Sequence, residues 1–240
     1  MRPLSLQHLC RPEAVVFDLH NTLMFGHDRL GPEQDYASTY RQLDGGRLPS
    51  ELVDEVVCAV VADRWAWNEP GLLPPMEQVA ARVLRRMGLQ GEEAARIAEV
   101  VALHEVGVLP QASRQLLHTL RRHTRLALVS NIWSDSRLWH DHFDRCGVSQ
   151  LFEVVVFSSE LGCDKPDPRI FLEALDQLDI VASECLFVGD DPVADIDGAG
   201  RLGFRTALVG PRPVATHRPD YQRSTLAELL PPEGDRHGGR

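Results

Sequence analysis

The stretch AVVFDLHNTL, residues 14–23, decides the fold of this chain. Its first four residues are apolar and rich in valine, which is typical of a strand buried on both faces. The strand is expected to end at Asp18, where polar residues begin. In an open α/β sheet, ligands bind beyond the carboxyl ends of the strands, so Asp18 marks the first place to look for chemistry.

The region after this strand has the pattern of helices and almost no strand signal. Three segments between Gly26 and about Gly107 place apolar side chains at helical spacing: residues 51–67, 76–87 and 92–106. Glycine and proline breaks divide the region into roughly four helices. Trp65 and Trp67, near the end of the first segment, either pack within this region or face a ligand.

Beyond Pro110, helix and strand patterns alternate. Helices are expected at residues 111–123, 136–146, 168–178 and from Asp195 onwards, with a last short helix near 224–230. Strands are expected at residues 126–129, 154–157, 186–188 and 206–209. Such alternation is typical of crossover units on a parallel sheet. The sequence therefore predicts an α/β fold, with a Rossmann-like parallel sheet core at residues 1–25 and 108–240 and an inserted all-helical cap domain at residues 26–107.

The composition is that of a globular protein. The 240 residues include 43% hydrophobic and 25% charged residues, and no apolar run approaches the roughly 18 residues of a membrane helix. Too few residues precede the first strand for a signal peptide. We therefore expect a cytoplasmic localisation and no membrane partner.

The charge and the cysteines argue against three further kinds of protein. A net charge of −10 disfavours a general nucleic-acid binder, although a local pocket can still bind an anion. The five cysteines lie far apart without a CxxC pair, which indicates neither a disulfide framework nor a zinc site. Whether the protein is a monomer or a homodimer is left open.

Polar residues follow each of the first four predicted strands of the core. In chain order they are Asp18, then Ser130 and Asn131, then Lys165, then Asp190 and Asp191, with Asp195 close behind. Carboxylates are ligands that Mg²⁺ prefers. Hydroxyl and ammonium donors can hold the oxygens of a phosphoryl group as charge shifts in the transition state. The pattern indicates a site for a phosphoryl group and a divalent cation.

Lys165 is the only lysine in the chain, against 24 arginines. Lysine presents a compact charge and arginine a wide planar fork, so the two are not interchangeable at a tight site. A single lysine at this position favours a specific role for its ammonium group.

The four polar segments, in this order and around a helical insertion, resemble the motifs of the haloacid dehalogenase-like superfamily. The segments KPDPRIF, residues 165–171, and VGDDPVADIDGA, residues 188–199, are similar to the branch with a small helical cap after the first motif. The resemblance extends from about Pro12 to Leu230. It implies a hydrolase that uses Mg²⁺ and acts on a small phosphorylated metabolite.

The resemblance implies a role for each residue that matches a motif. Asp18 matches the nucleophile, which forms a covalent aspartyl intermediate. Lys165 matches the lysine that steadies the nucleophile and the phosphate. Phosphate-binding residues are implied at Thr22, Ser130, Asn131 and Lys165. Metal ligands are implied at Asp18, Asp190, Asp191 and the backbone carbonyl of His20, with Asp195 supporting the loop.

His20 departs from the family pattern, which usually has a second aspartate here as an acid–base group. Histidine exchanges protons near neutral pH, so His20 is a candidate catalytic acid–base residue, or else a polar filler in a weakened enzyme. Two alternatives to a phosphatase follow. One is a 2-haloacid dehalogenase-type hydrolase, which also lacks the second aspartate, although Asp190 and Asp191 favour a metal-dependent enzyme. The other is a catalytically weak binding or regulatory protein.

Overall fold

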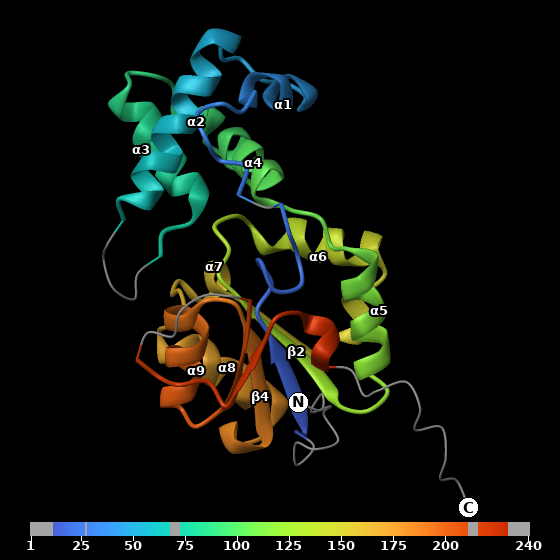
Figure 1. The fold of residues 1–240 in the computed structure, drawn as a ribbon. Helices are drawn as coiled ribbons and strands as arrows, with labels where there is room; N and C mark the ends of the chain where they lie inside the picture. Colours follow the sequence, from blue (N-terminus) through green and yellow to red (C-terminus); the bar gives the residue numbers. More distant parts are fainter. Residues whose placement is uncertain (1–11, 27, 68–72, 211–215, 230–240) are drawn as a thin grey trace, which may run out of the picture.

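One parallel β-sheet forms the centre of the molecule (Figure 1). The computed structural model describes residues 12–26, 28–67, 73–210 and 216–229, and within them the strand order is β3-β2-β1-β4-β5-β6. All five neighbouring pairs of strands are parallel. The strands are β1 (Ala14–Phe17), β2 (Arg125–Ser130), β3 (Val154–Phe157), β4 (Cys185–Gly189), β5 (Arg205–Val209) and β6 (Tyr221–Arg223). The predicted α/β class is thereby confirmed.

The strand order reverses at β1. The chain runs outward through β2 and β3 on one side of β1, then returns to add β4, β5 and β6 on the other side. A crevice opens beyond the carboxyl ends of the two strands at such a reversal, because the connections leave them in opposite directions. Asp18 follows β1 and Asp190 follows β4, so both residues lie at this point of the sheet.

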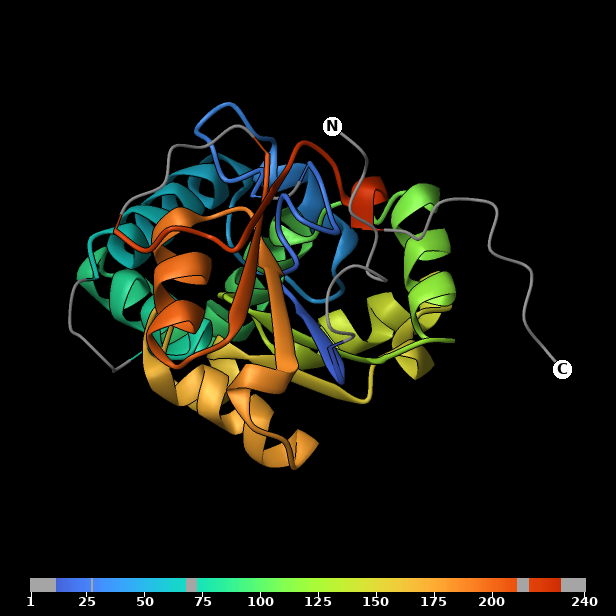
Figure 2. The same cartoon turned by 60° about the horizontal axis from the view of Figure 1, so that its bottom comes forward.

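Helices cover both faces of the sheet (Figures 1 and 2). Val15 and Phe17 of β1 belong to the apolar cluster on the face covered by α5 (Gln111–Leu120) and α6 (Ser136–Cys146). Ala14 and Val16 belong to the cluster on the face covered by α8 (Pro168–Leu178) and α9 (Gly198–Arg201). Successive strand residues point to opposite faces, so a strand between two helical layers is apolar throughout.

Between β1 and α5 the described residues form four α-helices, here called the insertion helices: α1 (Tyr36–Gln42), α2 (Ser50–Trp65), α3 (Met76–Arg86) and α4 (Ala94–Glu105). They gather at one end of the molecule (Figure 1). Their inward side chains form an apolar cluster separate from those of the sheet, with Val56, Val60, Val83 and Ile97 fully buried. The chain leaves and re-enters the core side by side, at an antiparallel bridge between Phe25 and Val108.

The last part of the chain differs from the sequence prediction. Tyr221–Arg223 form the edge strand β6, which the prediction lacks, and Leu226–Leu229 form a 3₁₀ helix, η5, in place of the expected α-helix. Residue 230, the predicted end of that helix, lies outside the described residues. The strand was missed because three residues with two polar side chains show no apolar alternation. The helix expected from Asp195 begins earlier, as a π-helix, η4 (Pro192–Asp197), that continues into α9.

The remaining elements are short: α7 (Ser158–Leu161), η1 (Gly91–Glu93), η2 (Ser149–Leu151) and η3 (Ala182–Glu184). Within the described ranges, none of the helices combines the length and the apolar composition that crossing a membrane requires. The four described cysteines, Cys58, Cys146, Cys163 and Cys185, are free thiols, and Cys10 lies outside the described residues.

Candidate active site

Lys165 and two aspartates form a buried ionic cluster at the carboxyl end of β1. Lys165 Nζ donates hydrogen bonds to Asp18 Oδ1 at 2.7 Å and to Asp195 Oδ1 at 2.6 Å. The side chain of Lys165 is only 2% exposed, and both carboxylates are buried as well. The ammonium also lies 5.5 Å from the centroid of the Phe187 ring. Lys165 therefore holds the carboxylate of Asp18 in a fixed position.

The cluster carries more negative than positive charge. Burial opposes the charged form of Lys165, but the carboxylates of Asp18 and Asp195 outweigh burial and raise the pKa of Lys165. Burial also raises the pKa of Asp195 to about 7, against the lowering effect of the Lys165 ammonium, and the Asp18 carboxylate adds to the rise. One ammonium thus leaves the carboxylates incompletely neutralised, and a bound cation would relieve the excess.

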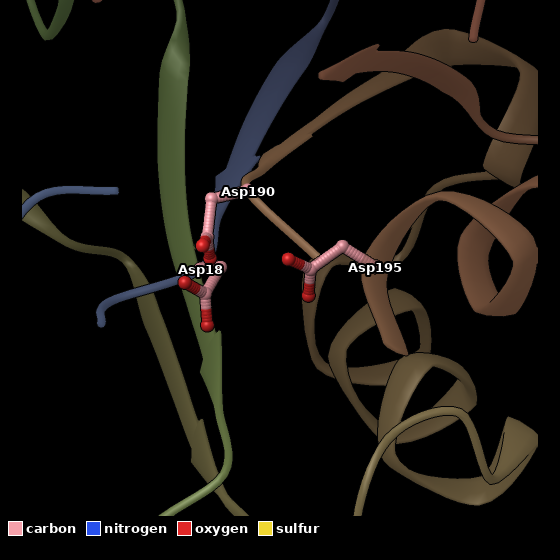
Figure 3. Close-up of side chains that lie close together, drawn as sticks. All are labelled: Asp18, Asp190 and Asp195. Carbon is pink, nitrogen blue, oxygen red and sulfur yellow. The ribbon is translucent and has the colours of Figure 1, made fainter. Parts of the chain in front are cut away.

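Asp190 joins Asp18 and Asp195 in an acidic group (Figure 3). One carboxylate oxygen of each residue lies within 4.8 Å of the other two, and all three residues are buried. Figure 3 shows Asp18 and Asp190 close together and Asp195 pointing toward them from the opposite side. Asp18 Oδ2 is buried and has no hydrogen-bond partner among the described residues. Hard carboxylate oxygens gathered in this way fit a divalent metal ion that prefers oxygen ligands.

The structure places Asp191 and Asp195 differently from one another. Asp191 Oδ1 accepts hydrogen bonds from the backbone N–H groups of Val193 and Ala194, both at 2.8 Å, and so caps the first turn of η4. Asp195 Oδ2 accepts from the backbone N–H of Asp191 at 3.0 Å. Asp195 therefore supports the loop, as the family resemblance implies, and also belongs to the acidic group, which does not include Asp191.

The expected phosphate-binding residues fall into two sets. Asn131 Oδ1 accepts from the backbone N–H of Lys165 at 2.8 Å, and Asn131 Nδ2 donates to the backbone carbonyl of Lys165 at 3.3 Å. Asn131 and Lys165 line the same cavity as Asp18. Thr22 and Ser130 are fully buried and do not line it. Ser130 Oγ donates to the carbonyl of Asn131 at 3.4 Å, and Thr22 Oγ1 has no hydrogen-bond partner among the described residues.

His20 lines the cavity beside Asp18 and is partly exposed. Its ring centroid lies 5.3 Å from that of Trp139, with the two planes inclined by 60°. Trp139 is fully buried, and its Nε1 donates to Ser134 Oγ at 2.8 Å. The imidazole, which lines the cavity, therefore packs at a tilt against a fixed aromatic ring.

A cavity of about 450 Å³ lies between the strand ends and the insertion helices. On the core side it is lined by the acidic group, His20, Asn131, Trp133, Asp164 and Lys165, among others. On the insertion side it is lined by Asp28, Arg64, Trp65, Trp67 and Glu105. Trp65, at the end of α2, and Trp67, just beyond it, thus both line the cavity. Its volume suits a small metabolite.

Direct contacts hold the insertion helices against the core. Arg64 of α2 forms an ion pair with Asp164, with 3.1 Å between Nη2 and Oδ2. The rings of Trp65 and Trp133 pack edge to face, with their centroids 4.7 Å apart. Nearby, the backbone N–H of Leu73 donates to the carbonyl of Gly162 at 2.8 Å. These contacts place side chains of α2 over the loops that follow β2 and β3.

Glu105, the last residue of α4, forms a further contact. Its carboxylate accepts from the backbone N–H groups of Trp133 at 2.6 Å and Ser134 at 3.0 Å. Burial raises the pKa of Glu105 to about 7, against the lowering effect of its hydrogen bonds to Ser134 and Trp133, and the carboxylate of Asp28 adds to the rise. Glu105 thus connects the end of the insertion to the loop that contains Asn131.

Sequence reasoning missed Arg64, Glu105, Trp133 and Asp164 as residues of the cavity. Arg64 and Asp164 are 100 residues apart, and no motif joins them. A usable signal did exist for Arg64, because it is the one basic residue of the segment Ser50–Trp65 and directly precedes Trp65. No comparable signal exists for Glu105, which reads as an ordinary charged residue at a helix end.

Known proteins share the sequence pattern of this chain. Residues 12–203 match the family described as haloacid dehalogenase-like hydrolase. A phosphoserine phosphatase of Thermus thermophilus is 32% identical over 179 residues, which cover 69% of this chain and 71% of that protein. A glyceraldehyde 3-phosphate phosphatase of Methanopyrus kandleri is 28% identical over 205 residues, which cover 82% and 83% respectively.

Solved structures share its fold. A 2-haloacid dehalogenase from Pseudomonas syringae pv. Tomato DC3000 superposes with a TM-score of 0.65 at 26% identity, covering 91% of this chain and 96% of the other. Because 91% of this chain is covered, the structural similarity extends over both the sheet and the insertion helices. Because the family match spans most of the chain and agrees with the acidic strand ends, this protein belongs to the haloacid dehalogenase-like hydrolases.

Proposed function

We propose that this hydrolase is a Mg²⁺-dependent phosphatase that acts on a small phosphorylated metabolite. The observation that carries the proposal is the acidic group of Asp18, Asp190 and Asp195 beside Lys165. Bound Mg²⁺ would offset the repulsion between the Asp18 carboxylate and an anionic phosphate. The two relatives named as phosphatases support the same class of reaction.

Asp18 is the proposed nucleophile. Its oxygen attacks phosphorus as the bond to the leaving oxygen breaks, and water then hydrolyses the aspartyl phosphate. Lys165 occupies Oδ1, so Oδ2, which has no partner among the described residues, is the oxygen proposed to attack. Asn131 positions Lys165 through its backbone. His20 is proposed to donate a proton to the leaving oxygen.

Residues 26–107 are proposed to act as a cap on a core formed by residues 1–25 and 108–240. Arg64, Trp65 and Glu105 reach the cavity from this region, so closure of the cap would exclude water and select the leaving group. Residues 1–11 and 230–240 of the proposed core lie outside the described residues. A cytoplasmic localisation, and the choice between monomer and homodimer, stay predictions from the sequence.

A 2-haloacid dehalogenase-type hydrolase is the second candidate. The solved structure from Pseudomonas syringae, named as a 2-haloacid dehalogenase, favours it, as does His20 in place of an aspartate. The acidic group of Asp18, Asp190 and Asp195 weighs toward the metal-dependent reaction, because three buried carboxylates repel one another unless cations neutralise them.

The test is a screen of the purified protein for two reactions. Phosphate release is measured on a panel of phosphorylated metabolites with Mg²⁺ and with EDTA, and chloride release is measured on chloroacetate without metal. We expect phosphate release that requires Mg²⁺ and no chloride release. Metal-independent chloride release would establish the dehalogenase instead. Binding of Mg²⁺ or phosphate without any turnover would establish a binding or regulatory protein.

A further inference from the structure

Arg64 is a cation from the insertion helices that reaches the cavity. It lies one residue before the end of α2, and its side chain is 7% exposed. The other described cation in the cavity lining is Lys165, whose ammonium already binds two carboxylates of the core. Arg64 therefore stands apart from the groups proposed to hold the transferred phosphoryl group.

Two contacts fix the guanidinium of Arg64 in place. Nη2 donates to Asp164 Oδ2 at 3.1 Å, and Cζ lies 5.0 Å from the centroid of the Trp133 ring. A guanidinium held by a carboxylate and an aromatic ring loses little further entropy when it binds a ligand. Its position is thus prepared before a substrate arrives.

The hydrogen-bonding capacity of Arg64 is not used up. A guanidinium has five N–H donors. Its Nε is buried and has no hydrogen-bond partner among the described residues. Because Arg64 lines the cavity and the described part of the structure shows one hydrogen bond from its guanidinium, to Asp164, the group keeps donors for an anionic ligand with several acceptor oxygens.

Two carboxylates near Arg64 already accept hydrogen bonds within the protein. Asp164 Oδ2, on the core side, accepts from Arg64 itself, while Asp164 Oδ1 has no hydrogen-bond partner among the described residues; Glu105 accepts two backbone N–H groups. Arg64 is therefore placed to receive the part of a substrate that extends from the strand ends toward the insertion helices.

We propose that Arg64 binds a second anionic group, a carboxylate or a further phosphate, on the leaving portion of the substrate. The inference rests on the proposed phosphatase activity and narrows its substrate class to phosphomonoesters whose alcohol carries another anion. The phosphoryl group that is transferred binds at Asp18 and Lys165, and the second anion binds at Arg64.

The test compares matched substrates. O-phosphoserine and O-phosphoethanolamine differ by one carboxylate, and fructose 1,6-bisphosphate and fructose 6-phosphate differ by one phosphate. In the wild type with Mg²⁺, we expect kcat/KM to favour the more anionic member of at least one pair. The pair that shows the preference identifies which anion Arg64 accepts.

Variants of Arg64 decide whether this residue causes the preference. For the pair that shows the preference, we divide kcat/KM for the more anionic substrate by kcat/KM for the less anionic one. We expect Arg64→Gln to reduce this ratio by about 10- to 100-fold, the usual effect of a hydrogen bond to a charged group. Arg64→Lys should reduce the ratio less, because the charge stays and the fork of donors is lost. Arg47→Gln is the matched control, since Arg47 forms an exposed ion pair with Glu92 on the insertion and does not line the cavity.

The outcomes separate this inference from the proposed function. Turnover of p-nitrophenyl phosphate without a preference in either pair would overturn the role of Arg64 alone. The role of Arg64 would also be overturned if the wild type favoured O-phosphoethanolamine over O-phosphoserine and showed no preference between the two fructose phosphates. It would be overturned as well if Arg64→Gln left the preference for the more anionic substrate unchanged. If no phosphomonoester is hydrolysed, both proposals fail. Should Arg64→Gln not fold, the same ratio in Arg64→Lys must fall for the inference to stand.

Discussion

Lys165 lies between two carboxylates in a space that suits one ammonium group. Its hydrogen bonds to Asp18 and Asp195 are short, and its side chain is almost inaccessible to solvent. A planar guanidinium would need more room and would direct its donors differently. Among 25 basic residues, the one lysine thus lies where an arginine would not fit.

The first prediction concerns this position. Lys165→Arg keeps the charge but overfills the space, so we expect a loss of about 1–3 kcal/mol in the free energy of unfolding and a fall in kcat of at least about 100-fold. Lys165→Met leaves buried carboxylates without their cation and should cost about 3–5 kcal/mol. Chemical denaturation and steady-state kinetics measure both effects. An arginine variant as active as the wild type would show that the ammonium has no specific role.

The second prediction concerns His20, which lies beside Asp18 at the cavity edge. Histidine changes its charge between about pH 5 and 8, and a nearby cation favours the neutral form. Alkyl phosphates, whose leaving oxygen needs a proton, should therefore be hydrolysed faster toward low pH. Aryl phosphates should depend less on pH. His20→Asp should raise kcat/KM for alkyl phosphates most.

The measurement is kcat/KM from pH 5 to 9 for both types of substrate in the wild type, His20→Asp and His20→Ala. His20→Ala should lose the pH dependence on alkyl phosphates while retaining more of its activity on aryl phosphates. Identical profiles for the wild type and His20→Ala, without any gain from His20→Asp, would rule out an acid–base role for His20.

At the scale of elements, the third prediction concerns the junction between α4 and the core. The pKa of Glu105 is about 7 in the folded protein and lies near 4.3 in an unfolded chain. A raised pKa means that the folded state favours the protonated carboxyl. The stability that Glu105 contributes is therefore full below about pH 4.3 and is lost as the pH rises through 7. Between pH 5 and 8 the loss should be about 2–3 kcal/mol.

Glu105→Gln removes this titration with little change in size. The free energy of unfolding of the wild type relative to Glu105→Gln should decrease by about 2–3 kcal/mol from pH 5 to 8. The comparison with Glu105→Gln isolates the titration of Glu105, because burial also raises the pKa of Asp195 and so adds a pH dependence of the same sign to both proteins. Urea denaturation at a series of pH values gives the result. Parallel curves for the two proteins would show that Glu105 does not titrate in this range.

Most of the elements could be predicted because their side chains repeat with a clear period. The apolar runs before Asp18 and Asp190 predict β1 and the middle of β4. Helical spacing predicts α2, although the predicted helix ends two residues later than the observed one. The edge strand β6 escaped prediction, since pairing with β5 alone sets the conformation of Tyr221–Arg223. Helix α1, with seven residues, is too short for its period to stand out.

At the scale of the whole molecule, most of the core side of the site could be predicted, whereas on the insertion side only Trp65 and Trp67 were candidates for facing a ligand. Carboxyl ends of parallel strands meet at one edge, so Asp18, Lys165 and Asp190 were expected to lie together from topology alone. Which of Asp191 and Asp195 joins them depends on the irregular path of η4. Arg64 and Glu105 reach the cavity only through the packing of α2 and α4 on the core, which local sequence does not specify.

The fourth prediction concerns metal and global stability. If the folded acidic group binds Mg²⁺, saturating metal should raise the free energy of unfolding, by about 3 kcal/mol at a concentration 100 times the dissociation constant. Asp190→Asn should lose most of this gain. Asp135→Asn should keep it, because Asp135 caps α6 outside the acidic group. Thermal unfolding in EDTA and in a Mg²⁺ series tests this, and a wild type whose midpoint ignores Mg²⁺ would contradict the metal site.

The nucleophilic role of Asp18 is tested most directly by Asp18→Asn. The variant keeps the shape of the side chain, and Asp195 remains as a partner of Lys165, so we expect a cooperative unfolding transition within about 5 °C of the wild type. We expect kcat with Mg²⁺ on the best phosphomonoester to fall by at least about 1,000-fold, since an amide oxygen is a poor nucleophile. A folded Asp18→Asn variant with activity within tenfold of the wild type would contradict attack by Asp18.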